Sequence, residues 1–154
     1  IKIQNKEKYV LFHFDEKWIY KDYINKYVNI EPSVDELIIF LGDLNKKTKK
    51  RIIITTGLKT PRLLRECMNR MKDINVSLLE NINFSSLENI VVNSDLLIAC
   101  HGAISHVAAA KKVKQIDIID LSYNYSRWTE HFRNYSYINR TKFNKLSKQI
   151  LETI

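Results

Sequence analysis

The segment 100–106 has the composition of an anion-binding turn at the start of a helix. It reads Cys-His-Gly-Ala-Ile-Ser-His and follows an apolar run at 95–99. Gly102 lets a ligand approach the backbone closely because it carries no side chain. The first N–H groups of a helix have no intrahelical acceptor and lie at the positive end of its dipole, so they favour a phosphate. Ser105 and His106 add hydrogen-bonding groups in the same turn.

A simpler interpretation of this segment stays open, in which Gly102 only forms a turn and His106 is an ordinary helix residue. His101 and His106 are five residues apart, which does not place both on one helix face, so the spacing predicts no metal site. Cys100 beside His101 is not expected to be a nucleophile with its base, because sequence neighbours rarely point at each other. The sequence predicts no metal and no cofactor.

Other polar groups follow other apolar runs. His13 and Asp15 come after the run at 8–14 and are candidate catalytic groups, although a purely structural role is as well supported. The loop 120–128 contains tyrosines and Trp128, which have the faces needed to stack on a base or a sugar, or simply to cover the end of a sheet.

Strand-like and helix-like segments alternate along the chain, and this alternation predicts how these groups are positioned. Strands are expected at 8–14, 52–56, 75–79, 95–99, 115–119 and 135–138, and helices are expected to begin near 33, 60, 85, 103, 127 and 141. Several strands are apolar without alternation, which indicates burial on both faces, as in a parallel sheet. The pattern predicts an α/β fold, a Rossmann-like three-layer sandwich with about six parallel strands, in one domain over 1–154. The carboxyl ends of its strands would meet at one edge, where ligands bind.

Capping signals mark three of the expected helix starts. The pairs are Ser33 with Glu36, Ser85 with Glu88, and Thr60 with Pro61. The first two have the spacing of a capping box, and the third has the pattern of an N-cap followed by proline.

The composition excludes several classes of protein. With 154 residues, 45% of them apolar and 27% charged, the chain is typical of one folded domain that buries its own core. No run of about 18 apolar residues occurs, so no membrane span is expected, and no apolar segment follows a basic start as in a signal peptide. Two cysteines do not make a disulfide framework, so a reducing, cytoplasmic setting is expected.

The net charge of +8 suggests an anionic partner. Lysine outnumbers arginine 18 to 7, whereas arginine is the better reader of phosphates and bases. The sequence also lacks a recognisable nucleic-acid module, so nucleic acid is not the expected partner. The basic run 46–51 is most simply a solvated helix end; peripheral contact with an anionic membrane surface is the alternative.

The segment 95–110 resembles the donor-binding signature of the lipopolysaccharide heptosyltransferases, which are GT-B glycosyltransferases. It reads Asp-Leu-Leu-Ile-Ala-Cys-His-Gly-Ala-Ile-Ser-His-Val-Ala-Ala-Ala. The run 8–14 followed by Lys17-Trp18 is similar to the family's strand and Lys-x-Trp segment, and 52–57 is similar to its strand ending in a glycine turn. The resemblance covers nearly the whole chain, as the C-terminal, donor-binding domain of a GT-B fold.

This resemblance implies that the chain binds a nucleoside-diphosphate sugar, from which the sugar passes to a glycan or lipid-linked acceptor of the cell surface, in the cytoplasm or at the inner membrane face. The donor-binding residues it implies are Lys17, Thr56, Gly57, Lys59, His101, Gly102, Ala103, Ser105, His106 and Trp128. The N-terminal acceptor domain, which supplies the catalytic base in this family, lies outside these residues.

The chain also departs from the family's pattern. His101 stands where the family has Asp, and Lys59 lies near an expected acidic contact to the ribose. These differences leave the donor open. Two alternatives remain: a sugar-nucleotide epimerase of the same fold, and a non-catalytic domain that binds a nucleotide or another anion.

Overall fold

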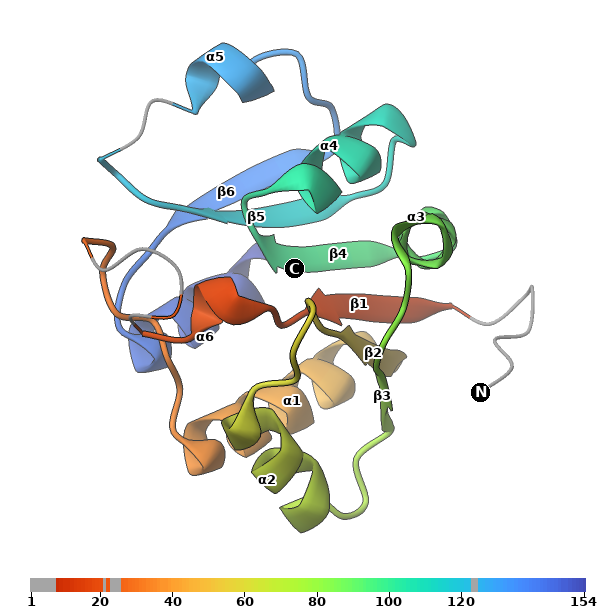
Figure 1. The fold of residues 1–154 in the computed structure, drawn as a ribbon, viewed down its shortest axis with the longest axis vertical. Coiled ribbons are helices and arrows are strands. Elements are labelled where there is room, and N and C mark those ends of the chain that lie inside the picture. The colour runs from red at the N-terminus through yellow and green to blue at the C-terminus, as the bar shows by residue number, and fades with distance from the viewer. Residues whose placement is uncertain (1–7, 21, 23–25, 123–124) are drawn as a thin grey trace.

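A parallel six-stranded sheet forms the centre of the molecule. The computed structural model describes residues 8–20, 22, 26–122 and 125–154. The strands are β1 (Tyr9–His13), β2 (Arg51–Thr55), β3 (Val76–Leu79), β4 (Leu96–Cys100), β5 (Gln115–Ile119) and β6 (Tyr135–Asn139), in the order β3-β2-β1-β4-β5-β6 (Figure 1). Every neighbouring pair is parallel.

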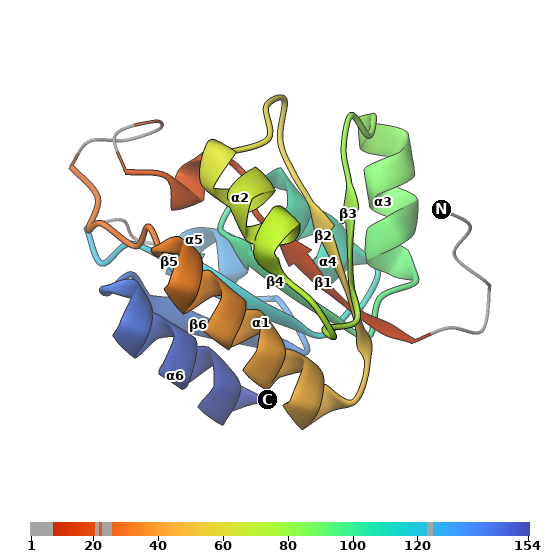
Figure 2. The ribbon, with the colours of Figure 1, turned by 90° about the horizontal axis from the view of Figure 1, so that it is seen from below.

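Helices cover both faces of the sheet, which confirms the predicted three-layer α/β fold (Figure 2). One face carries α1 (Val34–Thr48), α2 (Arg62–Arg70) and α6 (Phe143–Thr153), and the other carries α3 (Phe84–Val92) and α4 (Ala103–Ala110). The short helix α5 (Ser126–Thr129) precedes β6, and a 3-10 turn, η1 (Glu16–Trp18), follows β1. Within the described residues, no helix has the length and apolar character needed to cross a membrane.

Two hydrophobic clusters hold the layers together. Along β1, Val10 and Phe12 belong to the larger cluster beneath α1, α2 and α6, whereas Tyr9 and Leu11 belong to the smaller one beneath α3 and α4. The five residues of β1 are all buried. This two-sided burial explains why the strand sequence shows no apolar–polar alternation.

The strand order reverses between β1 and β4. From this point β1, β2 and β3 follow one another towards one edge, while β4, β5 and β6 follow one another towards the other. The loops after β1 and β4 therefore diverge, and such a switch point is where open α/β sheets bind ligands.

One of the predicted caps is confirmed and a second is wrong. The Glu36 N–H donates to Ser33 Oγ at 3.1 Å, and the Ser33 N–H donates to Glu36 Oε1 at 2.9 Å. In α2 the N-cap is Pro61, with no side-chain cap. The Thr60 hydroxyl instead donates to Glu80 Oε2 at 2.9 Å. This hydrogen bond to a residue distant in the sequence replaces the helix cap that the local pattern predicted.

The predicted capping box at Ser85 and Glu88 is also wrong. Helix α3 begins at Phe84, and Asn83 caps it by accepting the Ser86 N–H at 2.8 Å. Asparagine caps helices as well as serine does, so the earlier residue wins and the helix starts sooner than the pattern indicated.

Candidate functional site

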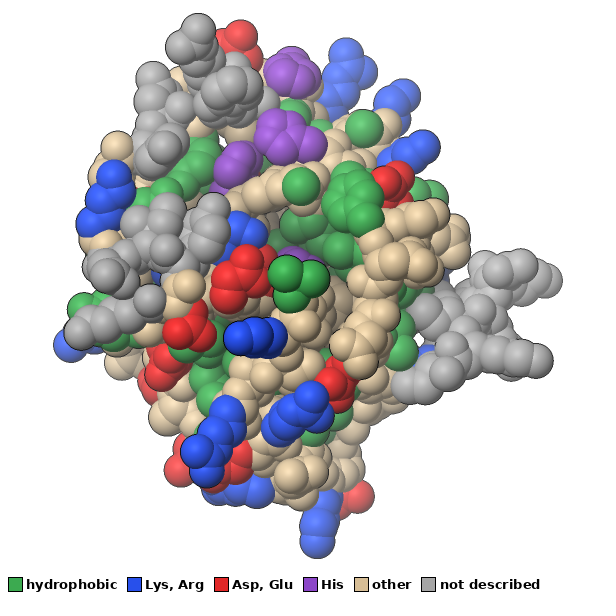
Figure 3. Space-filling model, in the orientation of Figure 1, with side chains coloured by type: hydrophobic (Ala, Val, Ile, Leu, Met, Phe, Trp, Pro, Cys, Tyr) green, Lys and Arg blue, Asp and Glu red, His purple; other side chains and the backbone are tan. Residues whose placement is uncertain are grey.

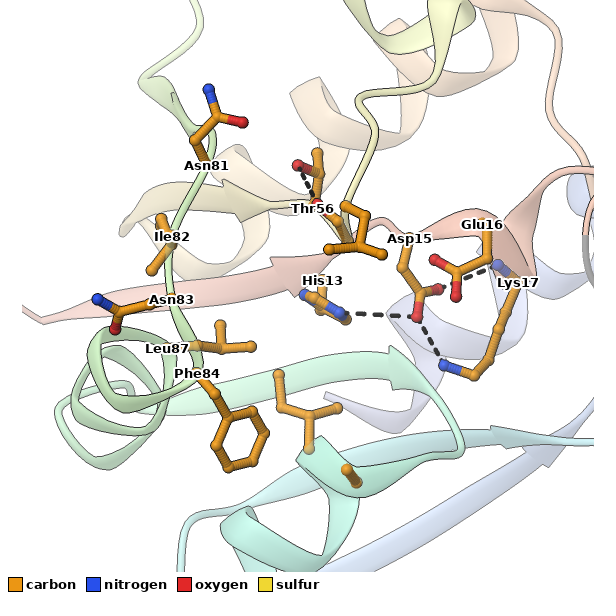
Figure 4. Close-up of a pocket in the computed structure, with 14 residues that line it drawn as sticks. His13, Asp15, Glu16, Lys17, Thr56, Asn81, Ile82, Asn83, Phe84 and Leu87 are labelled. Carbon is orange, nitrogen blue, oxygen red and sulfur yellow. Dashed lines mark hydrogen bonds and ion pairs between the residues drawn. The ribbon is translucent and has the colours of Figure 1, made fainter.

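A cavity of about 550 Å³ opens at the switch point, on the carboxyl edge of the sheet. Its walls are the loop after β1, the turn after β2, the segment from β3 into α3, and the first turn of α4 (Figure 4). Six of the residues expected from the sequence line it, namely His13, Asp15, Lys17, Thr56, Gly57 and Ala103. Tertiary structure thus brings together polar groups from three separate loops.

Asp15 and Lys17 form an ion pair on one side of the cavity (Figure 4). Lys17 Nζ lies 2.7 Å from Asp15 Oδ2, and the Lys17 N–H donates to Asp15 Oδ1 at 3.2 Å. Burial by itself would lower the pKa of Lys17, but the Asp15 carboxylate outweighs it, and the pKa is raised. Lys17 is therefore a fixed cation at neutral pH.

The Lys17 side chain reaches the start of α4. A Cβ atom built on Gly102 would lie 3.1 Å from Lys17 Nζ. Gly102 has extended backbone, with φ 177°, so close approach and not conformational freedom is the reason for a glycine here. The cation consequently lies beside the first turn of α4, at the positive end of the helix dipole.

His13 lies on the floor of the cavity between a hydroxyl and a carboxylate. Its Nδ1 is 2.8 Å from Thr55 Oγ1, and its Nε2 is 3.6 Å from Asp15 Oδ2. Burial lowers the pKa of His13 despite the nearby Asp15 carboxylate. Its backbone carbonyl accepts a hydrogen bond from Trp18 Nε1 at 3.0 Å. His13 is thus a neutral imidazole in a rigid setting.

Glu16 is a cavity residue that the sequence analysis missed. Its Oε2 would lie 2.6 Å from a Cβ on Gly57, so the carboxylate packs directly on the turn after β2. Lys59, which the resemblance placed near the ribose, is exposed and is not among the lining residues. The acidic group at this turn comes from η1, a different part of the chain.

The segment 81–87 forms the opposite wall and was also missed. Ile82, Phe84 and Leu87 present apolar surface to the cavity, facing Asp15 and Lys17 across it (Figure 4). Phe84 is 52% exposed, so much of its ring is accessible to a ligand in the cavity. Its position directly after the third predicted strand is the signal that could have found it.

The other residues expected at the start of α4 are tied to a buried carboxylate. Asp117, in the middle of β5, is 1% exposed. Its Oδ2 lies 2.6 Å from His101 Nδ1 and accepts the Tyr135 hydroxyl at 2.6 Å, while its Oδ1 accepts the Ser105 hydroxyl at 3.0 Å. Ser105 Oγ in turn accepts the Gly102 N–H at 3.2 Å. Ser105 therefore connects the backbone at the start of α4 to the buried Asp117 carboxylate.

His106 lies outside this network, on the exposed side of α4. Its ring centroid is 5.6 Å from that of His101 and 5.3 Å from that of Phe132. A spacing of five residues would separate the two histidines on a helix. His101, however, precedes α4, so that spacing did not apply and the two rings are neighbours. Burial, together with the nearby His101, lowers the pKa of His106. Histidine side chains gather on this side of the face shown in Figure 3.

The loop after β5 opens into a second cavity of about 490 Å³, which Tyr125, Tyr135 and Tyr137 help to line. The backbone of Trp128 belongs to α5, but its side chain lies outside the described residues. The predicted stacking role of this loop stays a prediction. In the part of the chain that the structure describes, no group of three His, Cys, Asp or Glu side chains could hold a metal ion.

The basic run 46–51 lies at the opposite, amino edge of the sheet, where α1 ends and β2 begins. Lys50 Nζ is 2.5 Å from Asp95 Oδ2, and Lys47 Nζ donates to the Leu151 carbonyl. Part of this run is thus bound within the domain. Its contact with a membrane surface stays a prediction.

The strand order and the cleft at the switch point define a Rossmann-like domain. No protein-family model and no curated protein matches the sequence, but solved structures share the fold. The chain is similar to E. coli heptosyltransferase WaaC with ADP (TM-score 0.67, 12% identity, 99% of this chain and 46% of that one). It is also similar to the glycosyl transferase family 9 protein from Veillonella parvula (0.64, 10%, 97% and 41%).

A third similar structure is the Methanocaldococcus jannaschii UDP-GlcNAc 2-epimerase in complex with UDP-GlcNAc and UDP (TM-score 0.63, 14% identity, 94% of this chain and 38% of that one). The chain thus spans less than half the length of each of these proteins. The comparisons confirm the predicted GT-B, heptosyltransferase-like fold.

Proposed function

We propose that this chain is the donor-binding domain of a glycosyltransferase that moves a sugar from a nucleoside-diphosphate sugar to a cell-surface glycan or lipid acceptor. The observation that carries the proposal is the contact between Lys17 and Gly102. It puts a fixed cation and the N-terminus of α4 at one point of the cleft, and this combination suits a diphosphate.

The same contact suits the chemical step. When the bond between the sugar and the diphosphate breaks, negative charge grows on the leaving diphosphate, and donors placed there in advance stabilise it. The Asp15 carboxylate raises the pKa of Lys17, so Lys17 is already charged before the bond breaks. The base that activates the acceptor hydroxyl is expected from a second domain, and we assign no catalytic base in this chain.

The two remaining walls suit the nucleoside. The apolar side chains of Ile82, Phe84 and Leu87 offer a surface for the base. The Glu16 carboxylate on the turn at Gly57 can accept hydrogen bonds from a ribose, as acidic residues do in other nucleotide-binding folds. Two of the similar structures contain ADP or UDP, which supports a nucleotide as the ligand.

An epimerase acting on a nucleotide sugar is the second candidate, because one of the similar structures is such an enzyme. An epimerase must move a proton at a sugar carbon. His13 and Asp15 lie in the cavity and are the groups here that could do so. Conversion of the sugar in the absence of any acceptor would favour this function over transfer.

Calorimetric titration with ADP, UDP, GDP and their sugar conjugates tests the proposal. One nucleoside diphosphate should bind selectively, and Lys17→Ala should weaken its binding by roughly 10- to 150-fold, since one charge-assisted hydrogen bond is worth roughly 1.5–3 kcal/mol. Lys148→Ala makes the same charge change on the exposed side of α6 and should leave the affinity unchanged. Equal loss in both variants, or no binding by the parent protein, would contradict the proposal.

A further inference from the structure

Packing alone does not explain why a carboxyl group, that of Asp117, is buried in the sheet. A charge inside a sheet is costly to bury, and an apolar residue of the same size is often no less stable. Here a carboxyl group is kept, and it contacts three side chains at hydrogen-bond distance, those of His101, Ser105 and Tyr135. Two of the three donors, His101 and Ser105, belong to the turn that opens α4. The network therefore connects the sheet interior to the candidate diphosphate site.

The contact with Asp117 determines what the His101 ring can do. Because a carboxylate accepts at 2.6 Å from Nδ1, that nitrogen carries the proton. Nε2, on the other side of the ring, is then a lone-pair acceptor in neutral His101 and a donor in the imidazolium. Only the imidazolium can donate a hydrogen bond to a phosphate oxygen.

The ring of His101 packs against three titratable side chains from different elements. The groups facing the ring are Asp117 from β5, His106 from α4, and Tyr125 from the segment before α5. Burial and the nearby His101 lower the pKa of His106, although the Asp117 carboxylate acts in the opposite direction. Of the two histidines, His101 is the one whose ring contacts the Asp117 carboxylate directly, at 2.6 Å.

We propose that Asp117 is a positioning residue that holds His101 so that its Nε2 takes up a proton when the donor's diphosphate binds at the start of α4. This inference rests on the proposed function. The proton comes from the solvent, and no bond of the ligand forms or breaks in the step. Lys17 and the His101 imidazolium then present two cations to the two phosphates.

Proton uptake is measured by calorimetry at one pH in two buffers of different ionisation enthalpy. The probes are UDP-glucose, ADP-glucose and GDP-mannose, whose phosphates are diesters and do not titrate near neutrality. The parent protein should take up a fraction of one proton per ligand. His101→Gln should abolish the uptake, and Asp117→Asn should reduce it. His131→Asn removes an exposed histidine near the same cluster and should change nothing.

Tyr135→Phe gives a second variant in case Asp117→Asn does not fold. It removes the other donor from Asp117 Oδ2, which strengthens the pull of that oxygen on the His101 proton. The titration midpoint of His101, followed by nitrogen NMR in the free protein, should rise in Tyr135→Phe and fall in Asp117→Asn.

The outcomes separate the two proposals. Nucleotide-sugar binding without proton uptake that depends on His101 would overturn the inference and leave the proposed function standing. A His101 midpoint that does not respond to Tyr135→Phe or to a folded Asp117→Asn would overturn the positioning role. Failure of every nucleotide sugar to bind would contradict the proposed function, and the inference would fall with it.

Discussion

The ammonium of Lys17 lies 3.1 Å from the position that a Cβ atom would occupy on Gly102. These residues follow β1 and β4, which are adjacent in the sheet although more than 80 residues separate their partners in the β1–β4 register. The contact lies at the point where the strand order reverses. It depends on the absence of one side-chain carbon, and this makes it easy to test.

Gly102→Ala should weaken nucleoside-diphosphate binding several-fold with little loss of stability. The extended backbone at Gly102 accepts any residue, and the atom that must move is the far end of a flexible lysine. The new methyl would push Lys17 Nζ away from the first turn of α4. Calorimetric affinity and the thermal midpoint should be measured together; an unchanged affinity would mean that this contact plays no part in binding.

The stability of the domain should fall as the pH is lowered from about 7 towards 5. Burial lowers the pKa of His13 in the folded state, whereas the unfolded chain binds a proton near 6.5. In this window the unfolded state holds more protons, so the free energy of unfolding falls by up to about 1.4 kcal/mol per pH unit.

His13→Gln should flatten this pH dependence, because glutamine does not titrate. Urea unfolding at several pH values measures it. The exposed His131 provides the control, and His131→Gln should keep the slope of the parent protein. An equally steep slope in His13→Gln would assign the proton uptake to another group.

Trp18 should be the most sensitive aromatic position near the cleft. It is fully buried, stacks on Phe14 at 5.5 Å and contacts Phe12 and Phe143 edge-on. Trp18→Ala should cost about 3–5 kcal/mol of unfolding free energy. Trp18→Phe keeps an aromatic ring of smaller volume but leaves the His13 carbonyl without its donor, and the lost hydrogen bond should cost about 1–3 kcal/mol. Denaturant unfolding measures both, and equal losses would show that ring volume is unimportant here.

Neither cysteine should react with a thiol reagent while the domain is folded. Both side chains are buried, and burial raises the pKa of Cys67 to about 11 and that of Cys100 still further above its ordinary value. The thiolate is the reactive form. At pH 8, Ellman's reagent should therefore label the two thiols only as fast as the folded domain opens to expose them. In urea, where the domain is unfolded, labelling should be rapid. Rapid labelling of the folded Cys100→Ser variant would contradict this for Cys67.

The order of strands and helices could be predicted from the sequence because it depends on local patterns. Apolar runs, glycine turns and the Ser33 cap act within a few residues of one another. The helix starts at Thr60 and Ser85 were predicted wrongly for a related reason. Thr60 hydrogen-bonds to Glu80, and Asn83 caps α3 by accepting the Ser86 N–H. The start of each helix therefore depends on which of several possible hydrogen-bond partners each group finds.

By itself, the sequence determined the fold class and named the two loops that meet at Lys17 and Gly102. Only the tertiary structure decided which side chains face each other there. Asp117 sits in a strand whose sequence shows one carboxylate among apolar residues, and Glu16 is one acidic residue in a polar loop. Their roles follow from neighbours distant in the chain, His101 and Gly57. Parallel pairing of the strands brings these groups close together. The strands that pair are distant in the sequence, so the spacing of residues within any one segment does not indicate the pairing.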